Sequence, residues 1–405
     1  MVEIKPFRGY RYNIEKVKDI SRVIAPPWDI IDNQMEEHLL KSSPFNIINL
    51  ISKNYNPDNV KKIFDRWREE SILKEDIDEC LYFMKHRFKW DGKEYTRKGI
   101  FTLLHLEDFT TGNVIPHEKI FEKHSINRYQ LIKICRTNFS PVFMLYQDRD
   151  SAIEHIIDRS TIISKGYISD REEFEFGIIK NEINHIKNII TPGKLIIADG
   201  HHRYNAALKY YKENPSEENS FVLVFLVNIN SPDVLILPTH RYFSSGISFN
   251  NRFDVFQRYF HIKEVSDLKT MTDSMALRKD NTFGIYESGR FYIITLKDIN
   301  EVKKYLSGKL SDRYIKLDTV ILHQFILPHI FESQPDEVIY HQLPEYLLEE
   351  YKKRENGVIF FLNAVKKQHF LDICFNGELM PQKTTYFYPK VPSGLVIYKF
   401  PHKNL

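Results

Sequence analysis

The pattern of apolar and polar positions divides the chain into predicted helices and strands. Residues 80–106 have the pattern of two strands joined by Asp91-Gly92, a dipeptide favoured in two-residue hairpin turns. Apolar residues at helical spacing predict a helix within residues 57–73. The segment "KLIIA" (194–198) is short, β-branched and bounded by Pro-Gly and Asp-Gly, which indicates a buried strand.

Further elements follow from the same pattern. Apolar residues at positions i, i+3, i+4 and i+7 from Tyr204 predict a helix directly after the 194–198 strand. Helices are also predicted at 151–158, 180–190 and 317–331, strands at 221–229, 233–238 and 357–363, and a hairpin at 283–296. The chain is therefore expected to be a mixed α+β protein with an N-terminal α/β region ending in a hairpin (1–110), a central core (111–245) and a C-terminal α+β region (246–405).

Composition excludes several classes of protein. Hydrophobic residues make up 42% and charged residues 27% of the 405 positions, which is ordinary for a soluble globular chain. A net charge of +3 is small for this length and disfavours a nucleic-acid partner. The three cysteines lack CxxC spacing, which fits a reducing compartment. No apolar run predicts a signal peptide or a membrane helix, so a cytoplasmic location is expected.

The segment "ADGHHR" (198–203) places an acid, a glycine, two histidines and an arginine where the predicted strand gives way to a helix. The first N–H groups of a helix lack internal partners and lie at the positive end of its dipole, so this junction predicts a phosphate site formed by Gly200, His201, His202 and Arg203. A lone carboxylate would repel phosphate. Asp199 fits if it binds Mg²⁺ or orients a histidine.

Two other interpretations of this cluster exist. Asp199 could cap the helix while Arg203 pairs with a surface acid. His201 and His202 could bind zinc, although adjacent residues rarely direct both rings at one metal and no nearby Cys or HxxxH partner is present. Phosphate binding accounts best for all five residues together.

The segment "IPHEKIF" (115–121) places His117 and Glu118 in a turn before a predicted helix. A carboxylate near a bound nucleotide could accept a proton from an attacking hydroxyl as a general base in phosphoryl transfer. The alternative is that Glu118 interacts with the helix dipole or caps the helix.

Three further groups are candidates for substrate contacts. Lys383, Thr384 and Thr385 lie in a polar run between prolines, and His240 and Arg241 follow a predicted strand. A lysine and two hydroxyls could bind a carboxylate or phosphate, and solvated side chains are the alternative in both places. Asp29 ends the rigid turn "PPWD", which presents a carboxylate.

These segments resemble a known family. The blocks "PFRGYRYN", "VIAPPWDII", "IPHEKIF", "ADGHHRYNAAL", "LPTHR" and "MPQKTTYFYPKVPSGLV" are similar, in this order, to those of the family called domain of unknown function 1015. The resemblance covers nearly the whole chain. It implies a shared fold, and the family name implies no activity.

A narrower resemblance concerns three of the blocks. Pro-His-Glu, Asp-Gly-His-His-Arg and a late Lys-Thr-Thr follow the order found in archaeal free-serine kinases, which have a ParB/sulfiredoxin-like fold. This resemblance implies a ParB/sulfiredoxin-like core, transfer of a phosphoryl group from ATP or ADP to the hydroxyl of free L-serine, and Mg²⁺ as cofactor. It implies Glu118 as the base, Asp199 and His201 as supporting catalytic groups, His117 and residues 200–203 as the nucleotide site, and residues 383–385 as contacts of the small hydroxylated substrate.

This sequence departs from the kinase pattern in its spacing. The first two blocks lie about eighty residues apart, farther than in the small serine kinases, and more than a hundred residues precede the first block. A nucleotide-binding regulatory module without catalysis is the competing hypothesis. The small net charge and the absence of an evident helix-turn-helix pattern disfavour a DNA-binding version of it.

Overall fold

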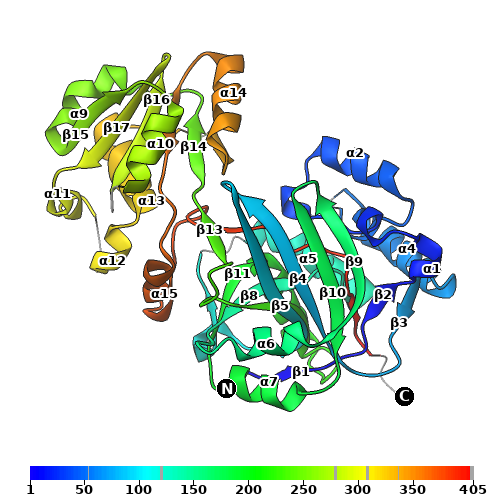
Figure 1. Ribbon diagram of the computed structural model, residues 1–405. Helices are drawn as coiled ribbons and strands as arrows, with labels where there is room; N and C mark the ends of the chain where they lie inside the picture. The colour runs from blue at the N-terminus through cyan, green and yellow to red at the C-terminus, as the bar shows by residue number, and fades with distance from the viewer. Residues whose placement is uncertain (53, 119–121, 278–280, 307–309, 336, 402–405) are drawn as a thin grey trace. The chain divides into compact units, whose positions relative to one another are not determined.

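The computed structural model describes residues 1–52, 54–118, 122–277, 281–306, 310–335 and 337–401. The chain forms two compact units (Figure 1). Unit 1 comprises Met1–Leu235 and Pro389–Leu405, and unit 2 comprises Ile236–Tyr388. The chain thus leaves unit 1 once and returns to it for its last residues.

Helices and strands alternate irregularly in unit 1. Its elements are β1 (Ile4–Lys5), β2 (Tyr10–Tyr12), α1 (Ile14–Val17), η1 (Ile20–Arg22), η2 (Trp28–Ile30), α2 (Asn33–Ser42), α3 (Ile48–Ile51), α4 (Pro57–Glu69), β3 (Leu73–Glu75), β4 (Leu81–Trp90), β5 (Lys93–His105), η3 (Phe109–Thr111), β6 (Val114–Pro116), α5 (Glu122–Cys135), β7 (Thr137–Asn138), β8 (Val142–Tyr146), α6 (Ala152–Asp158), β9 (Thr161–Ser169), β10 (Glu172–Ile179), α7 (Ile183–Ile190), β11 (Leu195–Asp199), α8 (His201–Glu213), β12 (Phe221–Asn228) and β21 (Tyr398–Lys399). The mixture confirms the α+β class.

One large sheet organises unit 1. Its strand order is β6-β11-β8-β12-β5-β4-β10-β9, and β1 pairs with β5. The predicted hairpin is confirmed as β4 and β5, with positive φ at both Asp91 and Gly92, as a two-residue hairpin turn requires. Because β5 pairs with β12, the expected regions 1–110 and 111–245 share one sheet. The boundaries of units 1 and 2 therefore differ from those of the three expected regions, 1–110, 111–245 and 246–405.

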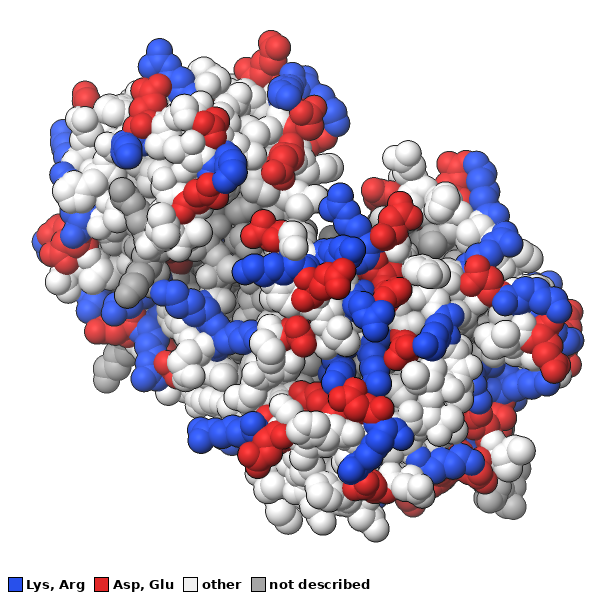
Figure 2. All heavy atoms as spheres, in the orientation of Figure 1, with Lys and Arg blue, Asp and Glu red and all other residues white. Residues whose placement is uncertain are grey.

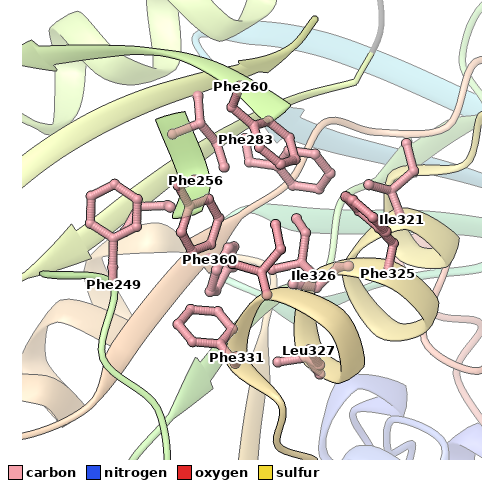
Figure 3. Close-up of a cluster of buried hydrophobic side chains, with 14 of the residues drawn as sticks. Phe249, Phe256, Phe260, Phe283, Ile321, Phe325, Ile326, Leu327, Phe331 and Phe360 are labelled. Carbon is pink, nitrogen blue, oxygen red and sulfur yellow. The ribbon is translucent and has the colours of Figure 1, made fainter. Parts of the chain in front are cut away.

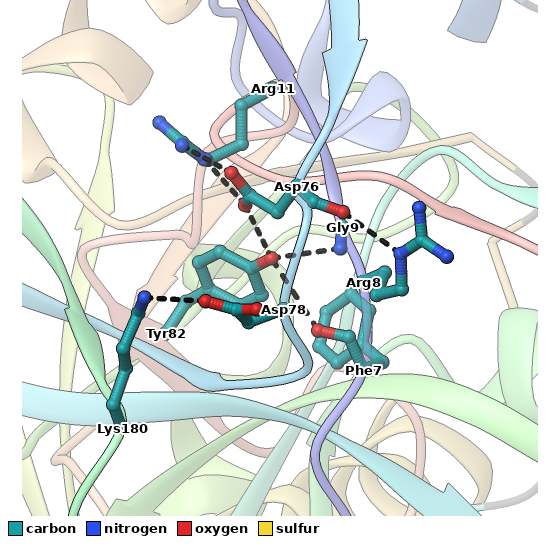
Figure 4. Close-up of polar contacts among 8 residues, drawn as sticks. All are labelled: Phe7, Arg8, Gly9, Arg11, Asp76, Asp78, Tyr82 and Lys180. Carbon is teal, nitrogen blue, oxygen red and sulfur yellow. Dashed lines mark hydrogen bonds and ion pairs between the residues drawn. The ribbon is translucent and has the colours of Figure 1, made fainter.

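The N-terminal motif "PFRGYRYN" is held against the start of β4 by one carboxylate (Figure 4). Asp76 Oδ2 accepts hydrogen bonds from Arg11 Nε at 2.8 Å and from the Tyr82 hydroxyl at 2.6 Å. The same hydroxyl accepts the backbone N–H of Gly9 at 2.8 Å, and a Cβ at Gly9 would lie 2.8 Å from it. Burial raises the pKa of Tyr82, so its hydroxyl stays protonated as a donor. The motif therefore fixes the chain to the sheet.

Unit 2 contains a second sheet. Its elements are β13 (Leu235–Leu237, beginning at the unit boundary), β14 (His240–Phe243), η4 (Asn250–Arg252), α9 (Phe253–Tyr259), β15 (Phe260–Val265), α10 (Leu268–Leu277), β16 (Thr282–Glu287), β17 (Arg290–Leu296), α11 (Ile299–Lys303), α12 (Asp312–Ile315), α13 (Asp318–Ile321), the π-helical η5 (Leu322–Phe331), β18 (Val338–His341), α14 (Pro344–Arg354), β19 (Val358–Phe361), α15 (Lys367–Phe375) and β20 (Tyr386–Tyr388). The sheet order is β15-β17-β16-β19-β14-β18 and β13 pairs with β20.

Aromatic side chains fill one face of the unit 2 sheet (Figure 3). Phe283 and Phe360 come from the sheet, Phe256 from α9, and Phe325 and Phe331 from η5, and all five are buried. Alternate strand residues point to opposite faces, so Tyr242 and Ile359 join a separate cluster with α10 and α14. The predicted 283–296 hairpin and 357–363 strand are confirmed as β16–β17 and β19.

Charged residues on the surface are mixed in sign. On the face shown, lysine and arginine side chains are interspersed with aspartate and glutamate (Figure 2), in keeping with the small net charge. The three cysteines are buried and free of disulfides. Among the helices that the structure describes, none combines the length and apolar character needed to cross a membrane.

Candidate functional site

Two parallel strands of unit 1 bring the first two sequence motifs together. β6 and β11 pair in parallel, with Ile197 opposite Pro116. His117 and Glu118 follow β6 directly, and Asp199 ends β11, so the carboxyl ends of both strands lie at the same edge of the sheet. The eighty residues between the motifs contain α5, β8, the β9–β10 hairpin and other elements of this unit, and they do not separate the motifs in space.

Gly200 makes the turn from β11 into α8. Its φ of +89° lies in the left-handed region, and a Cβ there would approach the Arg203 guanidinium to 2.8 Å. The Arg203 side chain also donates to the carbonyl oxygen of Pro141. Gly200 is the N-cap residue and no side chain caps the helix there, so α8 begins without the cap considered for Asp199. The first backbone N–H groups of a helix have no partner one turn earlier in the helix, which favours an anionic ligand at such a position.

Asp199 lies between two cations. Its Oδ2 accepts from Arg203 Nη2 and its Oδ1 from Lys390 Nζ, each at 2.6 Å. Arg97 in β5 donates to the carbonyl oxygen of Pro389 at 2.7 Å and so holds the segment that carries Lys390. Burial alone would raise the pKa of the Asp199 carboxyl, but Lys390 and Arg203 hold it well below its usual range. The carboxylate is thus paired through both oxygens, whereas the sequence analysis considered it as an Mg²⁺ ligand or as a group that orients a histidine.

Sequence reasoning missed Lys390. It lies 191 positions from Asp199 in the chain, beyond the whole of unit 2, and the local sequence "YPKVP" carries no ligand pattern. Only its position within a block shared with the resembled family could have drawn attention to it.

His117, Glu118 and His201 form a compact cluster. His117 Nδ1 donates to the Ile197 carbonyl oxygen at 2.5 Å, so Nε2 carries the ring lone pair. The His117 backbone N–H donates to His201 Nε2 at 3.4 Å, and His201 Nδ1 lies 3.5 Å from Glu118 Oε1. Burial lowers the pKa of His201 well below its usual value and also lowers that of His117. Both rings are therefore neutral at neutral pH.

The same cluster is a geometric candidate for a metal ion. One ligand atom from each of His117, Glu118 and His201 lies within 4.8 Å of the others. Two imidazoles and one carboxylate suit zinc or another transition ion better than Mg²⁺, which prefers oxygen ligands. The zinc pair considered from the sequence, His201 with His202, is not the group that the structure brings together.

The remaining unit 1 candidates are His202 and Asp29. His202 is in the first turn of α8 and half-buried. Asp29 is exposed in η2, and its charge acts on Arg128, whose guanidinium lies 4.3 Å from the centroid of the Trp28 ring. Burial and the charge of Arg203 lower the pKa of Arg128 to about 9. Arg128, from α5, is a second cation that the sequence did not single out.

The other predicted contacts lie in unit 2, where two motifs meet. The Arg241 guanidinium donates to the Lys383 carbonyl oxygen at 2.8 Å, and the Thr384 hydroxyl donates to the Pro381 carbonyl oxygen at 2.6 Å. His240 Nδ1 accepts the Leu362 N–H at 3.1 Å. His240 and Arg241 are both buried, and Arg241 supports the turn at Lys383, which is itself exposed with positive φ.

The sequence also matches a family profile. The profile described as "Protein of unknown function (DUF1015)" matches residues 4–320. The chain belongs to the DUF1015 family. This confirms the first resemblance and assigns no reaction. No protein of curated function matches the chain.

Several solved structures are similar to this DUF1015 protein at low identity. A conserved hypothetical protein from Pyrococcus furiosus is 13% identical, with 75% of this chain and 95% of that chain covered and a TM-score of 0.37. A free serine kinase in complex with AMP is 14% identical, with 74% and 91% covered and a TM-score of 0.38. SbnI from Staphylococcus aureus, truncated at its C-terminus, is 9% identical, with 73% and 86% covered and a TM-score of 0.38. TM-scores this low leave function to be argued from the residues of this chain.

Proposed function

We propose that unit 1 is a nucleotide-dependent phosphotransferase, with the phosphates at the start of α8 and Glu118 as the general base. The observation that carries the proposal is the approach of Glu118 to His201, the first residue of α8, with 3.5 Å between carboxylate and ring. The site thus combines an acceptor of protons with a helix start that favours anions.

Nucleotide binding is proposed from the start of α8 and from His202. The start of a helix favours an anion, because its first backbone N–H groups have no partner one turn earlier and the helix dipole adds partial positive charge. His202 adds a donor in the same turn. Arg203 and Lys390 are paired with Asp199, so they favour an anion mainly by fixing the β11–α8 turn.

Glu118 suits the role of base because it is partly open to solvent. Its side chain is 28% exposed, whereas its neighbour His201 is 4% exposed. The acceptor hydroxyl oxygen attacks the terminal phosphorus of the nucleotide, the bond from that phosphorus to the bridging oxygen breaks, and the hydroxyl proton passes to Glu118. His201, as a neutral ring, orients the carboxylate and acts as a positioning residue.

Free L-serine is the leading acceptor, because the three motifs follow the order seen in free-serine kinases. Asp29 is then a proposed contact of the amino acid, whereas Lys383, Thr384 and Thr385 belong to unit 2 and are not assigned to this unit 1 site. ATP or ADP is the proposed donor and Mg²⁺ the proposed cofactor. Both oxygens of Asp199 are already paired, which fits an Mg²⁺ ligand poorly, so no step is assigned to the ion.

A phosphoryl-transfer screen tests the proposal. Purified protein is incubated with Mg²⁺, ATP or ADP, and a panel of amino acids and sugars, and phosphorylated products are identified by mass spectrometry. We expect O-phosphoserine. Nucleotide binding without any phosphorylated product would favour the regulatory module instead, and the absence of both would remove the proposal altogether.

A further inference from the structure

Unit 2 contains a small, mostly polar pocket of its own. Its volume is about 40 Å³. A site for one water needs roughly 10–15 Å³, so the pocket has room for a small ionic group. The lining comes from the β13–β14 turn, β14, the start of α13, the residues after β19, the start of α15 and the turn before β20, and it includes Thr239, Arg241, Lys316, Asp318 and Lys366.

Thr239 contributes a hydroxyl that lacks a hydrogen bond. The residue is 2% exposed, and its Oγ1 has no partner among the residues that the structure describes. A buried hydroxyl left in this state destabilises a fold, so such groups are rare unless a ligand or water completes them. The two other lining threonines differ, because Thr319 and Thr384 bond to each other at 2.9 Å.

Arg241 brings a buried positive charge to the same pocket. Its hydrogen bonds run to the carbonyl oxygens of Thr239 and Lys383 and to His323 Nε2 at 3.2 Å, all neutral acceptors. Burial lowers its pKa to about 10, with Asp318 acting in the opposite direction. The guanidinium is therefore still charged at neutral pH, and no carboxylate hydrogen-bonds to it within the described chain.

Charge and helix geometry at the pocket also favour an anion. Lys316 and Lys366, which also line the pocket, are exposed. Together with Arg241 they give three positive charges against the one carboxylate of Asp318, so the charged residues of the lining carry a net charge of +2. The nine-residue α15 begins here with Lys366 as its N-cap and no side-chain cap. The start of α15, at the positive end of its dipole, lines the same pocket as Thr239.

We propose that this unit 2 pocket binds an oxyanion, the phosphate or carboxylate group of a small molecule, through Thr239, Arg241, Lys366 and the start of α15. The anion supplies the acceptor that the Thr239 hydroxyl lacks and compensates the Arg241 charge. All of these groups lie in unit 2, so the inference does not depend on phosphoryl transfer in unit 1.

Lysine labelling followed by mass spectrometry provides a local test. The full chain is acetylated under limiting conditions with and without inorganic phosphate, at constant ionic strength set with potassium chloride. At a phosphate concentration about ten times the Kd, labelling of Lys316 and Lys366 falls about tenfold, since only the unoccupied fraction reacts. Lys352, exposed on α14 and paired with Glu349, is the control in the same sample and keeps its rate. A parallel series with acetate separates a carboxylate from a phosphate preference.

Thr239→Val tests whether the hydroxyl contacts the anion. Valine keeps the shape and removes only the unpartnered group, so the fold is retained and the phosphate needed for half-protection rises about tenfold, as for one hydrogen bond to a charged group. Protection of Lys352 equal to that of Lys366 would overturn the proposal, because it would mean general screening. Protection of Lys316 and Lys366 that is unchanged in Thr239→Val would also overturn the proposal. So would the absence of protection up to about 10 mM phosphate, a concentration at which even weak sites are measurably occupied.

Discussion

The two motif arginines, Arg203 in unit 1 and Arg241 in unit 2, have different kinds of hydrogen-bond partner. In unit 1, Arg203 and Lys390 share one carboxylate, Asp199, which neutralises one of their two charges within the fold. In unit 2, Arg241 is held by carbonyl oxygens and a neutral histidine. The first arrangement builds a rigid turn and leaves anion binding to backbone N–H groups. The second leaves a charge that an anion can compensate.

An arginine can either hold the backbone of a site in place or bind the ligand, and its hydrogen-bond partners distinguish the two roles. Arginine in a motif suggests a phosphate ligand, yet Arg203 has a structural partner and Arg241, whose hydrogen bonds run to neutral acceptors, lines a pocket. The number of cations near a site therefore says less about anion binding than the acceptors to which they are bonded.

The largest expected effect concerns the compensated charges. Asp199→Asn leaves Arg203 and Lys390 buried beside a neutral amide, and we expect unit 1 to lose about 3–5 kcal/mol of unfolding free energy. All three tryptophans (Trp28, Trp67 and Trp90) lie in unit 1, so tryptophan fluorescence during urea denaturation follows this unit.

Asp158→Asn is the matched control for that experiment. Asp158 also binds two cations, Lys85 and Lys98, but its side chain is 45% exposed. Solvent screens such a surface cluster, so we expect a loss of no more than about 1 kcal/mol. Equal losses in the two variants would contradict a special role for the buried pair.

The next effect locates the chemistry in unit 1. Glu118→Gln keeps the shape of the side chain and removes the proton acceptor, so turnover in the transfer assay falls by about 10²-fold or more while nucleotide affinity is retained. Glu213→Gln, at the far end of α8, is the control and keeps its rate. Retention of more than about a tenth of the turnover in Glu118→Gln would exclude Glu118 as the base.

A smaller effect concerns pH and unit 2. Burial, with Arg241 and His341, lowers the pKa of His240 to about 3. A histidine in the unfolded chain has a pKa of about 6.5, so below that pH the unfolded chain binds more protons than the folded one. The free energy of unfolding therefore falls by on the order of 1 kcal/mol per pH unit as the pH decreases from about 6.5 toward 3. His240→Asn keeps an acceptor for the Leu362 N–H without titrating. Urea denaturation followed by far-ultraviolet circular dichroism should give a shallower pH dependence for the variant, and identical slopes would refute this prediction.

The smallest effect concerns the unpartnered hydroxyl. Without an anion, Thr239→Val should leave the unfolding free energy unchanged or raise it by up to about 1 kcal/mol, because the lost group has no partner. Thr319→Val, which removes the bond to Thr384, should lower it by about 1 kcal/mol. Chemical denaturation in chloride buffer measures both. A loss in Thr239→Val as large as in Thr319→Val would mean that the Thr239 hydroxyl is bonded in the folded protein.

Local pattern was sufficient for the elements with short-range signals. The Asp91-Gly92 hairpin, the strand at 194–198 and the helix after it depend on turn chemistry and periodicity within a few residues, and the structure confirms all three. The segment 233–243 differs from its prediction. The sequence predicts one strand that ends at Pro238, whereas the structure has two strands, β13 and β14, because proline interrupts strand pairing without ending the extended backbone.

The sequence by itself indicated the segments for which chemistry is proposed: His117-Glu118, residues 199–203, and the turns around Arg241 and Thr384. Only the tertiary structure decided how they are grouped. Parallel pairing of β6 with β11 joins the first two across eighty residues, the returning chain brings Lys390 to Asp199, and the unit 2 sheet joins Arg241 to Lys383. The reason is physical. Periodicity and turn signals act over a few residues, whereas the partner of a buried charge is set by strand pairing and packing between segments far apart in the chain.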